Sequence, residues 1–175
     1  MSELASSKSI AAPPWGVSGR AAQDVSPSDV GFDVTDKRYD PLVGATLCVL
    51  HRLWVYTEPF PARTAVIAVT DVGCRAHVDR VVQALSEGMR PRQAIFARAS
   101  ARMLATYPAL ALSTHGPTFA LSGGAATLRW ALALAVSLIG NQQCEAAVLI
   151  AADTLDDPPQ CQVSVMMFLR QREHS

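Results

Sequence analysis

The fold of this chain is decided by the stretch HGPTFALSGGAA, residues 115–126, together with the apolar run 128–139 behind it. Residues 119–121 suit a strand, and the adjacent glycines after them permit a sharp turn. The following residues are strong helix formers with Arg129 as their only charge, so we expect a helix buried on nearly all sides. A strand, turn and helix in this order often present a nucleophile in enzymes, but this turn offers only glycine and alanine.

Composition narrows the class of protein. The 175 residues suffice for one domain with a sizeable core, and 15 basic residues balance 15 acidic ones. This neutrality argues against nucleic acid or an anionic membrane as the main partner. The longest apolar run, 130–139, is shorter than the roughly 20 residues of a membrane span, and the N-terminus lacks the apolar core of a secretory signal. The cysteines are far apart, without a CxxC pair, which predicts reduced thiols and a cytoplasmic location: Cys48, Cys74, Cys144 and Cys161.

The rest of the pattern predicts a mixed α/β domain over residues 34–175. Residues 1–33 lack periodicity, so we expect a mobile or loosely packed arm anchored by Trp15, with a disordered tail as the alternative. We expect strands over 64–70, 119–121, 145–152 and 162–169. We expect helices over 41–54, 78–85, 93–105 and 125–139.

Local signals place several boundaries. Asp40 before Pro41 is typical of a helix N-cap, and Tyr107-Pro108 should end the helix over 93–105. Residues 153–159 read as a solvated acidic loop, with a cation site as the alternative. In the helix over 78–85, we expect an inward apolar face formed by Val78, Val81, Val82 and Leu85.

Taken in order, these elements resemble the N-terminal half of the β-ketoacyl synthases, which belong to the thiolase-fold superfamily. The resemblance covers about residues 36–169 and rests on four stretches. They are the strand over 63–70, the Gly-Pro-Thr-Phe strand over 116–119, the turn over 140–145 and the strand end over 151–153. It implies an α/β fold class, a thiolase-like layered α/β/α half-fold.

Two departures from that family bear on catalysis. Counting from Gly116-Pro117, the family's active-site cysteine falls on Ala125, which cannot carry an acyl thioester. The family's C-terminal half supplies two histidines and a lysine, and we expect it to be absent here. No histidine matches that motif: neither His51, His77, His115 nor His174. We therefore expect no catalytic residue, cofactor or metal.

The resemblance implies a non-catalytic, ketosynthase-like subunit of fatty acid or polyketide biosynthesis, similar to the chain-length factors and to short ketosynthase-like proteins. Such a pseudoenzyme would form a homodimer, or a heterodimer with an active ketosynthase, and would meet acyl carrier protein through that partner. The implied dimer interface is one strand: Thr118, Phe119, Ala120, Leu121 and Ser122. The implied acyl-pocket residues are Phe119, Gly124 and Ala125.

The sequence also leaves open the hypothesis that the protein is an enzyme of another kind. Ser122 could replace the missing nucleophile in acyl transfer or thioester hydrolysis, although no base lies near it in sequence. A cysteine could do the same, and Cys161 is the candidate for a partly exposed thiol. Cys74 and His77 form a C-x-x-H pair, which is too few ligands for zinc. A degenerate remnant without a biochemical role is the third hypothesis.

Overall fold

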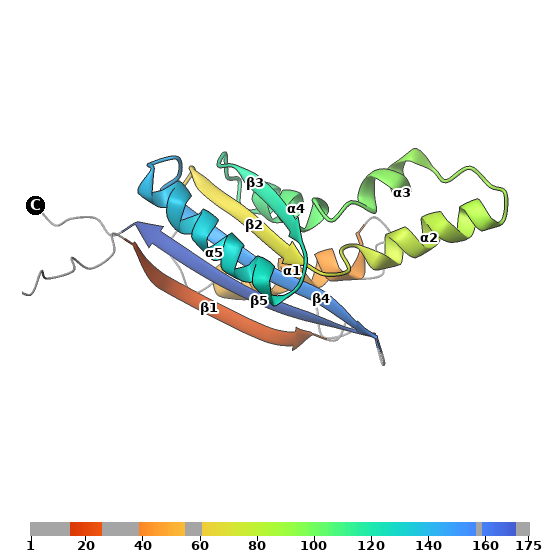
Figure 1. The fold of residues 1–175 in the computed structure, drawn as a ribbon, viewed down its shortest axis with the longest axis horizontal. Coiled ribbons are helices and arrows are strands. Elements are labelled where there is room, and N and C mark those ends of the chain that lie inside the picture. Colours follow the sequence, from red (N-terminus) through yellow and green to blue (C-terminus); the bar gives the residue numbers. More distant parts are fainter. Residues whose placement is uncertain (1–14, 26–38, 55–60, 157–158, 171–175) are drawn as a thin grey trace, which may run out of the picture.

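The computed structural model describes residues 15–25, 39–54, 61–156 and 159–170. This part of the chain forms one mixed sheet of five strands in the order β1-β5-β4-β2-β3 (Figure 1). The strands are β1 (Trp15–Val25), β2 (Thr64–Thr70), β3 (Thr118–Ser122), β4 (Ala146–Asp156) and β5 (Pro159–Arg170). β2 pairs in parallel with both β3 and β4, whereas β5 is antiparallel to β4 and β1.

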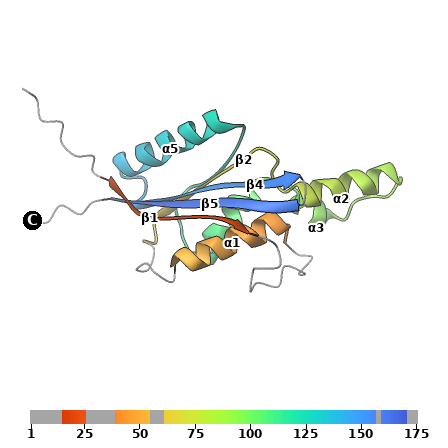
Figure 2. The ribbon, with the colours of Figure 1, turned by 90° about the horizontal axis from the view of Figure 1, so that it is seen from below.

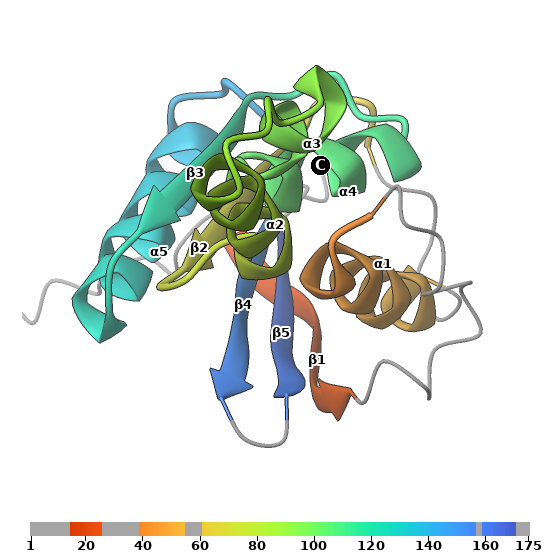
Figure 3. The same cartoon turned by 90° about the vertical axis from the view of Figure 1, so that its right-hand side faces the viewer.

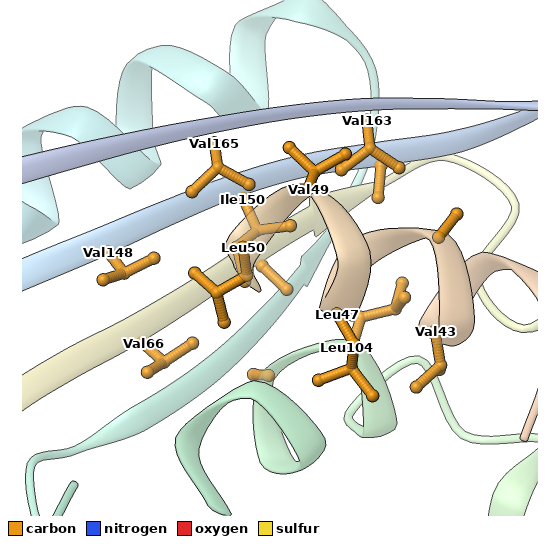
Figure 4. Packing of buried hydrophobic residues seen from close by; sticks show 14 of the residues in the cluster. Val43, Leu47, Val49, Leu50, Val66, Leu104, Val148, Ile150, Val163 and Val165 are labelled. Atoms are coloured by element: carbon orange, nitrogen blue, oxygen red, sulfur yellow. The ribbon is translucent and has the colours of Figure 1, made fainter. Parts of the chain in front are cut away.

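Helices cover both faces of the sheet, with α1 on the opposite side from α5 (Figure 2). They are α1 (Pro41–Trp54), α2 (Arg75–Ser86), α3 (Gln93–Arg98), α4 (Met103–Ala111) and α5 (Ala125–Gly140). One apolar cluster lies between the sheet and α1 and α4, where Leu50 and Leu104 meet Val66 and Ile150 (Figure 4). A second apolar cluster lies between α5 and the opposite face of the sheet. The predicted layered α/β/α arrangement is therefore confirmed.

β2 shows how the sequence produces this layering. All seven of its residues are buried, as predicted from its continuous apolar run. Because side chains alternate along a strand, Val66 and Ala68 join the α1/α4 cluster while Ala65 and Ile67 join the α5 cluster. Gly116 allows the segment before β3 to approach the start of β2 closely, because a Cβ there would clash with the backbone carbonyl of Thr64.

The N-terminal arm is a first correction. Residues 15–25 of the predicted loose arm, 1–33, form β1, which pairs along β5 from Trp15↔Arg170 to Val25↔Cys161. β5 supplies backbone hydrogen bonds to this strand, and such pairing needs no apolar alternation in the sequence. The other residues of the predicted arm, and the side chain of Trp15, lie outside the described residues, so the boundary at 33/34 stays a prediction.

Two further element boundaries differ from the sequence prediction. The acidic segment expected to be a loop over 153–159 continues β4 to Asp156, because it pairs with β5 from Asp153↔Gln162 to Asp156↔Pro159. Pro108 does not end a helix but lies buried inside α4. The single helix expected over 93–105 is two helices, α3 and α4, separated by a turn.

Two helices expose apolar faces that we expected to be buried. On α5 the sheet side is buried, but Trp130 on the outer side is 74% exposed, so the helix is not covered all round. On α2 only His77 and Val81 are buried. Figure 1 shows the reason: α2 and α3 extend beyond the end of the sheet, and no layer of the described chain covers α5 from outside.

Candidate functional site

The candidate site lies where the carboxyl ends of the parallel strands β2, β3 and β4 meet the start of α5. Ligands of open α/β sheets bind at this edge. The predicted strand, turn and helix are confirmed: β3 ends at Ser122 and α5 begins at Ala125. Gly123 has φ +139°, which is accessible to glycine, and its N–H donates to the Thr70 carbonyl at 3.2 Å.

Asp153 of β4 fixes the end of the neighbouring strand β2 and the turn that follows it. Its Oδ1 accepts hydrogen bonds from Thr70 Oγ1 at 2.9 Å, from the Asp71 N–H at 2.7 Å and from the Val72 N–H at 3.2 Å. Thr70 Oγ1 in turn accepts from the Gly73 N–H at 2.8 Å. A carboxylate with three donors on one oxygen fixes a turn, so Asp153 is not the solvated loop residue that the sequence predicted.

The predicted catalytic positions sit at the turn itself. Ser122 is exposed at the end of β3, and within the described residues its hydroxyl has no hydrogen bond to a histidine or carboxylate that could activate it. Ala125 is the first residue of α5, directly after the N-cap Gly124. The helix therefore directs its first N–H groups and the positive end of its dipole toward a position without a nucleophilic side chain.

The predicted interface strand β3 lies at an edge of the sheet, where it pairs with β2 alone in the described part of the chain. Pro117 O accepts from Val66 N–H at 3.0 Å, and Gly123 N–H bonds to Thr70 O, so the odd-numbered residues face β2. By alternation, Thr118, Ala120 and Ser122 direct their backbone N–H and C=O groups to the open edge.

Two of the predicted acyl-pocket residues occupy different surroundings. Phe119 is partly buried and packs on the cluster between the sheet and α5. Gly124 is open: a Cβ built there meets no atom within 4 Å. Phe119 lies within β3 and Gly124 directly before α5, and their role in an acyl pocket stays a prediction.

The cysteines are placed poorly for nucleophilic chemistry. All four are buried, including Cys161, which we expected to be partly exposed. Burial raises the pKa of Cys74 to about 12 and that of Cys161 to about 11, and the nearby Asp40 carboxylate adds to both shifts. Burial also raises the pKa of Cys144. Since the thiolate is the nucleophile, these three thiols are unreactive near neutral pH.

A buried Asp40–His77 pair is the arrangement that the sequence analysis missed. Asp40 Oδ1 caps α1 by accepting from the Leu42 N–H at 3.0 Å, which confirms the predicted N-cap. Its Oδ2 lies 3.1 Å from both the backbone N and the Nδ1 of His77. The N-cap has a local signal, but nothing in the sequence links two residues 37 positions apart.

The pair resembles the carboxylate–histidine half of a catalytic triad. However, His77 is completely buried, and its Nε2 has no hydrogen-bond partner among the residues that the structure describes. No hydroxyl or thiol is therefore activated there. The pair instead joins the first turn of α2 to the start of α1.

Neither a metal cluster nor a membrane span is found in the described ranges. No group of three or more His, Cys, Asp or Glu side chains could hold a metal ion there. Asp157 and the side chain of Asp156, which belonged to the alternative cation site, lie outside the description. No helix in these ranges is both long and apolar enough to cross a bilayer.

The turn before α5 gives a matched pair of glycine variants. We expect Gly123→Ala to lower the free energy of unfolding by about 2 kcal/mol or more, because of its positive φ and a clash with the Thr127 side chain. We expect Gly124→Ala to cost less than about 1 kcal/mol, since its φ of −65° suits alanine and the space is open. Urea unfolding measures both, and equal losses would contradict the assigned turn geometry.

The buried pair predicts a second stability difference. We expect Asp40→Ala to lower the free energy of unfolding by about 3 kcal/mol, because it removes the N-cap and leaves His77 without its partner. Asp79→Ala is the control, since Asp79 is an exposed carboxylate 3.9 Å from Arg75, and we expect a loss of at most about 0.5 kcal/mol. Similar losses in urea unfolding would show that the pair does not join α1 to α2.

No protein-family model and no curated protein matches the sequence. Solved structures do match. The ishigamide ketosynthase/chain length factor gives a TM-score of 0.71 at 15% identity, over 86% of this chain and 49% of that chain. The AntDE:AntF structure, a type II PKS acyl-carrier protein in complex with its ketosynthase bound to the hexaketide, gives 0.66 at 13%, over 87% and 53%.

A third structure is the ketosynthase ApeO in complex with its chain length factor ApeC from Xenorhabdus doucetiae. It gives a TM-score of 0.59 at 15% identity, over 79% of this chain and 60% of that chain. The chain thus spans about half the length of the solved structures that it matches. Over that span, its fold is the one shared by ketosynthases and chain length factors, as the sequence resemblance predicted.

Proposed function

We propose that this protein is a non-catalytic, ketosynthase-like subunit in polyketide or fatty acid biosynthesis. It pairs with itself or with an active ketosynthase, which it stabilises or whose acyl pocket it shapes. The observation that carries this proposal is Ala125 at the start of α5, because an alanine there cannot form an acyl thioester. The likeness of the fold to ketosynthases and chain length factors supports the assignment of the start of α5 as the position of the ketosynthase nucleophile.

The open edge of β3 supports pairing. Unpaired strand edges offer rows of N–H and C=O groups to another chain. Here the groups without a strand partner among the described residues belong to Thr118, Ala120 and Ser122, and a two-fold axis near Ala120 would let two such edges form an antiparallel pair. Pairing of this kind would continue the sheet into the partner subunit.

The outer face of α5 supports pairing from a second direction. Trp130 is 74% exposed, and the exposed residues around it on the helix are the charged Arg129 and the small residues Ala126, Ala133 and Ser137. Small residues let another element approach closely, and a large exposed aromatic side chain is typical of an interface anchor. A partner that covers this face would restore the burial predicted from the sequence.

The same surroundings count against the alternative of an acyl-transfer enzyme. Ser122 lacks an activating partner in the described part of the chain, and Cys74 and Cys161 are buried with raised pKa values. A subunit of this kind would influence chemistry only through its partner. Phe119 in β3 and Gly124 before α5 are the residues from which it would shape an acyl pocket.

Pairing can be tested with variants of the two surfaces. We expect Trp130→Glu to weaken association at least 10-fold without lowering the melting temperature, because the side chain is mainly exposed. We expect Ala120→Pro to weaken it as well, since it removes an N–H at the open edge. The measurement is sedimentation equilibrium, with the protein alone and mixed with an active ketosynthase.

Leu110→Glu is the control for this experiment, because Leu110 is 68% exposed on α4, on the opposite face of the sheet from α5. It should leave association unchanged. A monomer that binds no ketosynthase, or equal effects of Trp130→Glu and Leu110→Glu, would contradict the proposal.

Catalysis is tested separately. We expect no covalent adduct and no hydrolysis above the uncatalysed rate when the protein is incubated with acyl thioesters, since Ala125 offers no nucleophile. Intact mass and thiol release are the measurements. An adduct that disappears in Ser122→Ala would instead establish the alternative enzyme.

A further inference from the structure

Helix α2 carries an apolar stripe that the described part of the chain leaves uncovered. Together with α3, which it contacts, α2 extends past the end of the sheet (Figures 1 and 3). Only His77 and Val81 of α2 are buried, and His77 holds the first turn of the helix to Asp40. The stripe runs along α2 and the turn after it, with side chains that are 39 to 59% exposed: Val78, Val82, Leu85 and Met89.

The spacing of the stripe is that of a coiled-coil seam. Its residues follow one another at four, three and four positions, which is the alternation of the a and d positions in a heptad repeat. No charged residue interrupts it, because Arg80 and Glu87 fall on the opposite side of a helix with 3.6 residues per turn. A seam of this kind is suited to packing against another helix.

We propose that the helix packed on this stripe is α2 of a second copy of the protein, antiparallel to the first. A two-fold axis between Val82 and Leu85 places Val82 of each copy against Leu85 of the other, and Val78 against Met89. This surface is separate from the β3 edge and from the outer face of α5, so the proposal goes beyond the pairing described above and does not depend on it.

The position of α2 favours the antiparallel order. Because the helix projects beyond the sheet, antiparallel packing leaves the two sheets at opposite ends of the contact (Figure 1). Parallel packing would bring both sheets to the same end, where they would compete for space. The dipoles of two antiparallel helices also oppose each other, which is the favourable arrangement.

Charge favours the same order. The base of α2 has one negative charge in excess and the turn after α2 has one positive charge in excess, from these exposed residues: Asp71, Arg75 and Asp79 at the base, and Glu87, Arg90 and Arg92 after the helix. Antiparallel packing brings each basic turn toward the acidic base of the other copy, whereas parallel packing brings like charges together. The remaining arginines of this region, Arg98 and Arg102, belong to α3 and to the segment before α4.

An anionic membrane fits α2 less well than a second copy. Helices that lie on such membranes carry mainly lysine and arginine opposite their apolar side. Opposite the stripe, α2 and its C-cap carry one charge of each sign, Arg80 and Glu87.

Four side chains from each copy make a small contact, well below a standard protein interface. We therefore expect weak association, with a Kd of about 100 μM, at high protein concentration. Copies that are already joined through another surface would form the same contact more readily, because it becomes intramolecular in effect.

Crosslinking of introduced cysteines tests the contact and its direction. All four native cysteines are buried, so a short bismaleimide should react mainly with the new thiol. We expect Val82→Cys to form a crosslinked dimer by itself, and Val78→Cys to crosslink to Met89→Cys when the two variants are mixed. Met89→Cys alone should not crosslink, since the antiparallel order separates the two copies of this residue by about 16 Å along the helix axis.

Sedimentation equilibrium of the full-length protein measures the strength of the contact. Val82→Asp should weaken this association at least 10-fold, and its exposed position should leave the melting temperature unchanged. Leu110→Asp is the matched control, because it makes the same kind of change at an exposed residue of α4, and it should have no effect.

The same experiments separate this contact from the proposed function. Trp130→Glu should leave crosslinking through Val82→Cys unchanged, even where it abolishes subunit pairing through α5. Conversely, Val82→Asp should leave binding to an active ketosynthase unchanged.

The proposal is overturned if Val82→Cys does not crosslink at protein concentrations above the expected Kd. Equal association of the wild-type protein and Val82→Asp has the same consequence, as does crosslinking of Met89→Cys alone that matches the mixed pair. Sedimentation with phosphatidylserine vesicles, or binding to a ketosynthase, that Val82→Asp abolishes while no self-association is found would assign the stripe to another occupant.

Discussion

Hydrogen bonds that converge on Thr70 hold the candidate site in place. Its carbonyl accepts from Gly123 N–H and so fixes the turn before α5, while its hydroxyl donates to Asp153 and accepts from Gly73 N–H. Thr70 is completely buried at the end of β2, between β3 and β4. Thr70 therefore connects the turn before α5, Asp153 within β4 and the segment that leads into α2.

The interactions that fix the turn before α5 do not require a nucleophile at the start of that helix. The turn depends on Thr70, on the positive φ of Gly123 and on the parallel pairing of β2 with β3. The residues that make these interactions do not include Ala125. The shape of a nucleophile site can consequently persist without a nucleophile, because the same strand and helix also present an edge and a face for association.

Local patterns predicted the parts of the fold that local physics determines. The apolar run of β2, the N-cap at Asp40 and the glycine turn before α5 each carry their own signal, and each is confirmed. The strand over 15–25 and the extension of β4 to Asp156 were missed, because pairing with β5 produces them. The Asp40–His77 contact was missed for the same reason: it joins residues that only the tertiary structure brings together.

The two wrong predictions about helix faces have one cause. An apolar stripe with helical spacing predicts that a face will be buried, but it does not say whether the covering surface belongs to the same chain. On α5 the stripe facing the sheet is buried and the opposite face, with Trp130, is exposed; on α2 most of the stripe is exposed. Exposing apolar surface opposes folding and solubility, so a chain with two such faces would gain stability from partners that cover them. The outer face of α5 and the free face of α2 are therefore the surfaces through which the proposed assembly would form.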